Sequence, residues 1–195
     1  QIAAVAVNLL MTTQQFLAAS WFFLRLKPGP AQQHAADPLI NGLASSGDKL
    51  LFRLLLWRRR AVFFHDDAAW SRVGFALMKF EWPRRAVKWL SDWPQRPNVQ
   101  MYVLFNLCLA LRQLGSYPEA HQLALHVMKT WPHRDGADDL RIFLAVEEAM
   151  NGATEAAQTH LDRAAARPDV TYDQQLLALA KALVTLRQTP PIERK

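Results

Sequence analysis

Apolar residues recur at helical spacing through residues 101–134, which form the most regular stretch of the sequence. One predicted helix ends at Gly115, and its apolar face carries Leu104, Leu107, Cys108 and Leu111. A second predicted helix opens at Pro118 and ends at Pro132, and its apolar face carries Ala120, Leu123, Ala124, Val127 and Met128. Proline at the start of a helix and glycine just past its end are typical helix-boundary residues. The stretch therefore predicts two antiparallel helices joined by a short turn.

The register of this stretch matches a known repeat pattern. Its positions in register with the 34-residue tetratricopeptide signature are Leu104, Leu107, Cys108, Leu111, Gly115, Tyr117, Ala120, Ala124, Val127 and Pro132. The stretch therefore resembles a tetratricopeptide repeat (TPR), in which small residues such as Ala120 lie where the two helices cross closely. It departs from the pattern at two positions. Leu104 stands where a large aromatic residue is usual, and Cys108 is the small residue at the eighth position.

Neighbouring units can be placed one period to either side. Ala86 lies one 34-residue period before Ala120, which puts Trp70 and Gly74 on the Trp and Gly positions of the pattern. Downstream, Gly152 lies three residues beyond one period after Gly115. We predict an all-α fold: a right-handed solenoid of antiparallel helix pairs with about three to four TPR-like repeats. The expected segments are an apolar helix (1–27), a linker (28–38), a degenerate helical hairpin (39–66), TPR-like repeats (67–171), a capping helix (172–189) and a tail (190–195).

The N-terminal segment has two interpretations, which both stay open at this point. Residues 1–24 contain no charged side chain, and the run is long enough to span a bilayer, with Arg25 and Lys27 as a cytoplasmic flank. Alternatively the same helix packs its apolar side on the first hairpin, and Asn8, Thr12 and Gln15 form a polar stripe. The triplet Arg58, Arg59 and Arg60 could contact lipid headgroups or phosphate, although exposed arginines are also common at helix C-termini.

Charge is unevenly distributed along the chain. The net charge is +6, of which residues 1–66 contribute +4, residues 67–134 contribute +5 and residues 135–195 contribute −3. A basic N-terminal region favours an acidic partner or an anionic surface. It also permits nucleic-acid binding, but most of the seven tryptophans lie at predicted helix-packing or helix-end positions, which makes nucleic acid the weaker alternative. The single cysteine, Cys108, is expected to be a buried structural thiol and is consistent with a cytoplasmic location.

No catalytic constellation emerges from the motifs. The sequence holds no Gly-rich phosphate loop, no Cys-His cluster and no HExxH motif, and we expect neither enzymatic activity nor a cofactor or metal. The His65-Asp66-Asp67 run is better explained by an aspartate capping the next helix than by metal binding. Because the chain begins with Gln, an alternative is that it forms a regulatory or substrate-docking segment of a larger enzyme whose catalytic part lies upstream.

The resemblance to TPR proteins implies a binding groove lined by the first helix of each repeat. The family's ligand-facing positions carried over to this sequence include Arg72, Phe75, Lys79, Tyr102, Phe105, Asn106, Leu109, Arg112, Gln113, Asp139 and Phe143. Asn106 matches the asparagine that grips a bound peptide backbone in the family. The basic clamp of chaperone-binding TPRs is missing, because its positions carry Ser71, Phe75, Asp139 and Phe143. The alternative is that these phenylalanines are core residues between repeats.

These observations predict a non-enzymatic scaffold that binds another protein or peptide segment through its concave groove. By analogy alone, such a scaffold could assemble a bacterial envelope or polysaccharide-export complex at the cytoplasmic face of the inner membrane.

Overall fold

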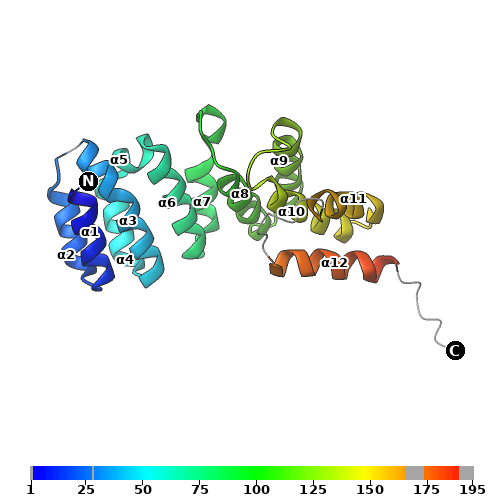
Figure 1. The fold of residues 1–195 in the computed structure, drawn as a ribbon, viewed down its shortest axis with the longest axis horizontal. Helices are drawn as coiled ribbons and strands as arrows, with labels where there is room; N and C mark the ends of the chain where they lie inside the picture. The colour runs from blue at the N-terminus through cyan, green and yellow to red at the C-terminus, as the bar shows by residue number, and fades with distance from the viewer. Residues whose placement is uncertain (1, 28, 166–173, 189–195) are drawn as a thin grey trace. The chain divides into compact units, whose positions relative to one another are not determined.

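The computed structural model describes residues 2–27, 29–165 and 174–188 (Figure 1). Within these ranges there are twelve α-helices and one 3₁₀ helix, and no strand. The all-α prediction is therefore confirmed. The chain divides into two compact units, which are unit 1 (Gln1–Val99) and unit 2 (Gln100–Lys195).

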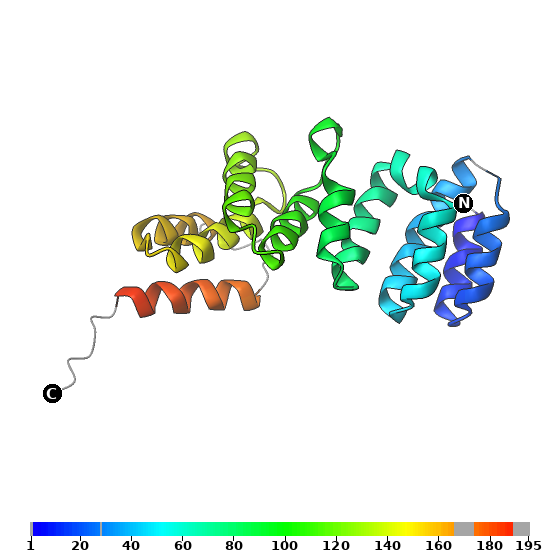
Figure 2. The same cartoon turned by 180° about the vertical axis from the view of Figure 1, so that it is seen from behind.

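Unit 1 is built around its longest helix, α3. Its elements are α1 (Ile2–Thr12), α2 (Phe16–Arg25), α3 (Pro30–Ser46), α4 (Lys49–Arg58), α5 (Arg60–His65), α6 (Asp67–Lys79), α7 (Pro83–Leu90) and η1 (Trp93–Gln95). Helix α3 contacts α1, α2, α4, α5 and α6, and its buried face carries Leu39, Ile40 and Leu43. Helices α1, α2 and α3 lie alongside one another in both views (Figures 1 and 2).

The N-terminal segment forms two helices where the sequence predicts one. Helix α1 ends at Thr12, Gln14 adopts a left-handed φ of 58°, and α2 begins at Phe16. The hydroxyl of Thr12 donates to the carbonyl of Asn8 (2.8 Å) and that of Thr13 to the carbonyl of Leu9 (2.9 Å). Such side-chain bonds compete with the helical backbone bonds, and here they occur where α1 ends. Within the described residues, no helix combines the length and the apolar character that a membrane crossing requires.

The structure also differs from the predicted linker 28–38, because most of this segment is helical. From Pro30 onward this polar segment belongs to α3, and Pro38 lies inside the helix. Proline at a first helical position costs nothing, because the missing N–H has no intrahelical partner there. Ala35 and Ala36 are fully buried, so packing holds the segment helical in spite of its polar composition and of Pro38.

Helices α6 and α7 pack against each other within the segment 67–171 that was predicted to hold the repeats. Asp66, not Asp67, caps α6, because its carboxylate accepts from the Ala69 amide at 2.7 Å. A Cβ at Gly74 would lie 2.6 Å from a methyl group of Leu90, so any other residue at this position would require the buried Leu90 side chain to shift. Gly74 was predicted only to occupy the Gly position of the repeat pattern, and its contact with Leu90 is a finding of the structure.

Unit 2 consists of helix pairs around α10. Its elements are α8 (Met101–Gln113), α9 (Tyr117–Thr130), α10 (Ala137–Met150), α11 (Thr154–Ala165) and α12 (Gln174–Gln188). Helix α10 contacts all four others, and α8 packs on α9. Gly115 (φ 80°) and Gly152 (φ 84°) end α8 and α10 in the left-handed conformation that glycine adopts most readily. The predicted tail 190–195 lies outside the described residues.

Candidate functional site

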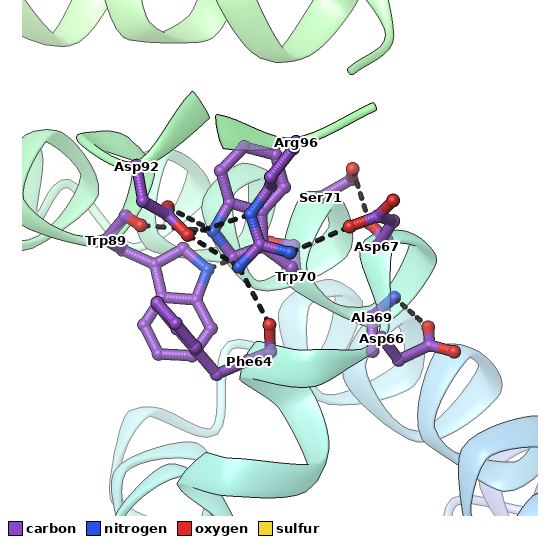
Figure 3. Close-up of polar contacts among 9 residues, drawn as sticks. All are labelled: Phe64, Asp66, Asp67, Ala69, Trp70, Ser71, Trp89, Asp92 and Arg96. Carbon is purple, nitrogen blue, oxygen red and sulfur yellow. Dashed lines mark hydrogen bonds and ion pairs between the residues drawn. The ribbon is translucent and has the colours of Figure 1, made fainter. Parts of the chain in front are cut away.

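An arginine-centred network fixes the α6–α7 pair (Figure 3). The Arg96 guanidinium bonds to carboxylate oxygens of Asp67 at 2.8 Å and Asp92 at 2.7 Å, and donates to the Phe64 carbonyl at 2.8 Å. It also lies 4.1 Å from the ring centroid of Trp70. Because one nearly buried cation joins the end of α5, the start of α6 and the segment after α7, this corner of unit 1 is a rigid support.

Two tryptophans complete this support by exchanging hydrogen bonds between α6 and α7. The Trp70 indole N–H donates to the Trp89 carbonyl at 3.1 Å, and the Trp89 indole N–H donates to the Trp70 carbonyl at 2.9 Å. Buried indoles require such partners. The sequence pattern placed Trp70 at a packing position, but it gave no sign of the reciprocal bond.

The predicted groove residues fall in both units, and those of unit 1 share one face of α6. Phe75 is 39% exposed and Lys79 is exposed, so both are accessible to a ligand. Arg72 is half-exposed and forms an ion pair with Asp37 of α3 at 2.7 Å. The structure therefore brings these three side chains to one surface but commits Arg72 to an internal partner.

The predicted groove residues of unit 2 are more deeply placed. Of these residues Gln113 alone is exposed, and the half-buried ones are Tyr102, Phe105, Asn106, Leu109, Arg112 and Asp139. Phe143 is fully buried and meets Phe105 edge to face, with ring centroids 6.4 Å apart. Phe143 thus belongs to the core and not to an accessible surface, because α10 is covered on the side that carries it. This corrects its assignment to the groove.

Arg112 and Cys108 both contribute to a buried polar spot beside α10. Arg112 lies 3.0 Å from the carboxylate of buried Glu147 and 3.0 Å from the sulfur of Met150. Burial, helped by the charge of Glu147, raises the pKa of the Cys108 thiol to about 12. The thiol therefore stays protonated at neutral pH, and a reactive role does not fit it.

A large hollow in the described part of unit 1 lies between α4 and α7, and sequence reasoning missed it. Its volume is about 640 Å³. We call it the α4–α7 groove, and its lining residues are Leu50, Arg53, Leu54, Leu56, Trp57, Arg60, Leu77, Arg85, Lys88 and Trp89.

The α4 wall of the groove is an uncovered apolar helix face. Leu50, Leu54 and Trp57 are 79%, 47% and 73% exposed, and with Arg53 they follow one another at helical spacing. The opposite face of α4 supplies the buried residues Leu51, Phe52 and Leu55. Contiguous exposed apolar side chains of this size are typical of interaction sites.

The α7 wall combines an apolar base with a basic rim. Trp89 and Leu77 are buried at the base, and Arg85 and Lys88 are exposed above it. Because Arg85, Lys88 and Trp89 are spaced by three and four residues, they lie on one face of α7. The lining holds four cationic side chains and no acidic one.

The sequence signal for this groove was the run of apolar residues on nearly all sides of residues 50–64. A helix with that pattern is expected to be buried all round, whereas the structure covers only one side of α4. The three arginines at the end of this helix have different environments. Arg59 donates to the Leu24 carbonyl, Arg58 lies over the Trp57 ring at 5.6 Å, and Arg60 lines the groove.

Two comparisons with known proteins find no match for this chain. No protein-family model matches the sequence, and a search of curated proteins finds no significant match. The fold itself defines the class: an all-α protein of packed helix pairs, compatible with a helical repeat protein.

Proposed function

We propose that this protein is a non-enzymatic, TPR-like scaffold that binds another protein. Three consecutive helix pairs, α6–α7, α8–α9 and α10–α11, occupy the segments that the 34-residue register assigns to them. This agreement supports the interpretation as repeats of a right-handed solenoid. Such repeats act by presenting surfaces to a partner.

The observation that carries the binding function is the α4–α7 groove. Leu50, Leu54 and Trp57 leave large apolar surfaces in water. Removing each from water would contribute about 1.5–3 kcal/mol to a complex, before the costs of association. Because the Arg96 network fixes the adjoining end of α5 with α6 and α7, little ordering of this side of the groove opposes binding. The exposed α6 residues Phe75 and Lys79 are proposed as secondary contacts.

Photo-crosslinking in the native cell tests this proposal. Benzoyl-phenylalanine replaces Leu54 in the full chain, and a matched chain carries it at Arg84, which is exposed on α7 but does not line the groove. We expect a discrete protein adduct from position 54 that is absent from position 84 and is lost when Trp57→Ala is added. Identical adducts from both positions, or none from position 54, would contradict binding at the groove.

A further inference from the structure

We infer that the α4–α7 groove takes an amphipathic α-helix of a partner protein whose apolar stripe is flanked on both sides by carboxylates. The inference rests on the proposed function and adds the chemistry of the partner. It depends on three features of the groove, which are the placement of its charges, their lack of internal partners and the shape of its apolar surface.

The charges lie on both sides of the apolar base. Arg53 and Arg60 come from the side of α4 and α5, and Arg85 and Lys88 come from α7. A ligand lying on Leu77 and Trp89 would therefore meet cations along both of its edges. Complementary charge at these edges requires carboxylates on each side of the ligand's apolar stripe.

These four cations are free for such a partner. Among the described residues no ion pair engages any of them, whereas Arg72, Arg96 and Arg112 of the same chain each pair with a carboxylate. Arg85 lies 4.7 Å from the Trp82 ring centroid, and Arg60 lies 6.0 Å from that of Phe64. Stacking of this kind places the guanidinium groups and leaves their N–H donors available.

The apolar face matches the repeat of a docked helix. Leu50, Leu54 and Trp57 follow one another at the spacing i, i+4 and i+7, over about 10 Å of helix axis. Helices that dock into grooves use anchors at the same spacing. Three anchors of a partner helix can therefore contact the whole length of the α4 wall.

The concave shape favours a protein helix over a lipid surface. Leu77 and Trp89 line the base of the groove between the α4 and α7 walls, so a flat bilayer resting on the rim would not fill the space above them. Interfacial membrane binding buries side chains that protrude. An inserted helix would cover the base and the two walls together.

Two helical peptides test the inference against the full chain. Both carry Leu, Leu and Trp at i, i+4 and i+7, and the flanking positions are Glu in one peptide and Lys in the other. We expect the Glu peptide to bind at least about tenfold more tightly by fluorescence anisotropy at low salt, and the difference to shrink as salt screens the charges.

Matched variants locate the binding. Trp57→Ala should weaken the Glu peptide by at least about tenfold, while Trp21→Ala, another exposed tryptophan, should leave it unchanged. Arg85→Glu should also weaken it by about tenfold, whereas Arg84→Glu, the same charge change one residue away, should not. Circular dichroism of each variant checks that the helices are intact.

The other outcomes are distinct. Equal binding of both peptides with the same dependence on Trp57 would overturn the acidic character of the partner and leave the groove as a protein-binding site. Binding of anionic phosphatidylserine vesicles through Trp57 and Arg85, with no peptide binding, would overturn the helix and assign the surface to lipid. If neither peptide nor vesicles bind, the inference is wrong, and the crosslinking at position 54 then decides the proposed function separately.

Discussion

Helices α4 and α10 look alike in their apolar content but differ in what covers them. In unit 2, α10 contacts α8, α9, α11 and α12, and eleven of its residues are buried. In unit 1, α4 buries only Leu51, Phe52 and Leu55, and its other side is open. The fold therefore uses α10 as a core element and leaves α4 with an apolar face in water, which is where we place binding.

The comparison also applies to charged residues. Helix α10 buries Asp138, Arg141 and Glu147, and each has a partner of opposite charge. Around α4 the cations Arg53 and Arg60 are exposed and have no such partner among the described residues. A buried charged side chain requires a partner of opposite charge inside the protein, whereas the exposed cations beside α4 remain available to a ligand.

The largest expected effect comes from placing a charge on each helix. Ala145→Arg puts a cation into the fully buried face of α10 and should destabilise unit 2 by about 4 kcal/mol or more. Leu54→Arg on α4 should change the free energy of unfolding by less than about 0.5 kcal/mol. Urea denaturation followed by circular dichroism measures both, and equal losses of stability would refute the distinction.

The second-largest expected difference in stability comes from truncating one aromatic residue on each helix to alanine. Phe143→Ala should cost about 3–5 kcal/mol, because it leaves a cavity beside Phe105. Trp57→Ala removes a larger ring but should cost less than about 0.5 kcal/mol, since that ring is 73% exposed. Thermal unfolding of the two variants makes the comparison, and a large loss at Trp57 would mean that another part of the chain covers it.

Removing one partner of the ion pair beside α10 should have a moderate effect. Arg112→Leu leaves the buried Glu147 carboxylate without its cation and should cost about 2–3 kcal/mol, since Arg112 is itself partly exposed. Adding Glu147→Leu should recover most of that loss, because no charge then remains buried. On the open side, Arg53→Leu should leave the urea midpoint unchanged. Failure of the double variant to recover would show that the pair does more than neutralise Glu147.

The smallest effect concerns pH and His160, which is half-buried on α11. Burial lowers the pKa of His160 below 6.5, against a partial opposing pull from Glu148 and with help from nearby cations. The neutral form is therefore favoured in the folded state. Its contribution to stability is present above about pH 6.5 and is lost as the pH falls through the lower folded pKa. The unfolding midpoint should drop between pH 7 and pH 5, and His160→Gln should drop less. An equal drop in the variant would exclude His160 as the cause.

Much of the fold could be predicted from local signals. Gly115, Gly152 and Pro83 mark helix ends through their own backbone conformations, and the positions of Trp70 and Gly74 follow from the repeat register. These features depend on residues close in sequence. They therefore appear in the pattern of the chain itself.

The proposed binding surface was harder to predict from the sequence. Hydrophobic periodicity shows that a side of α4 is apolar, but which side is covered depends on tertiary packing against α3 and α2, which the local pattern does not encode. For the same reason Phe143 looked like a groove residue although it is buried by neighbouring helices. The break at Gln14 was missed because the hydrophobic pattern continues through it, and the bonds from the Thr12 and Thr13 hydroxyls to backbone carbonyls leave no mark on that pattern.

Hydroxyl-radical footprinting of the full chain, read by mass spectrometry, tests the contrast between the two helices most directly. We expect Trp57 to be oxidised rapidly in the free protein and protected by the Glu-flanked helical peptide, while Phe143 reacts slowly in both states. A Trp57 that is already protected in the free protein, or that stays reactive at saturating peptide, would contradict the assignment of the open face of α4 as the docking surface.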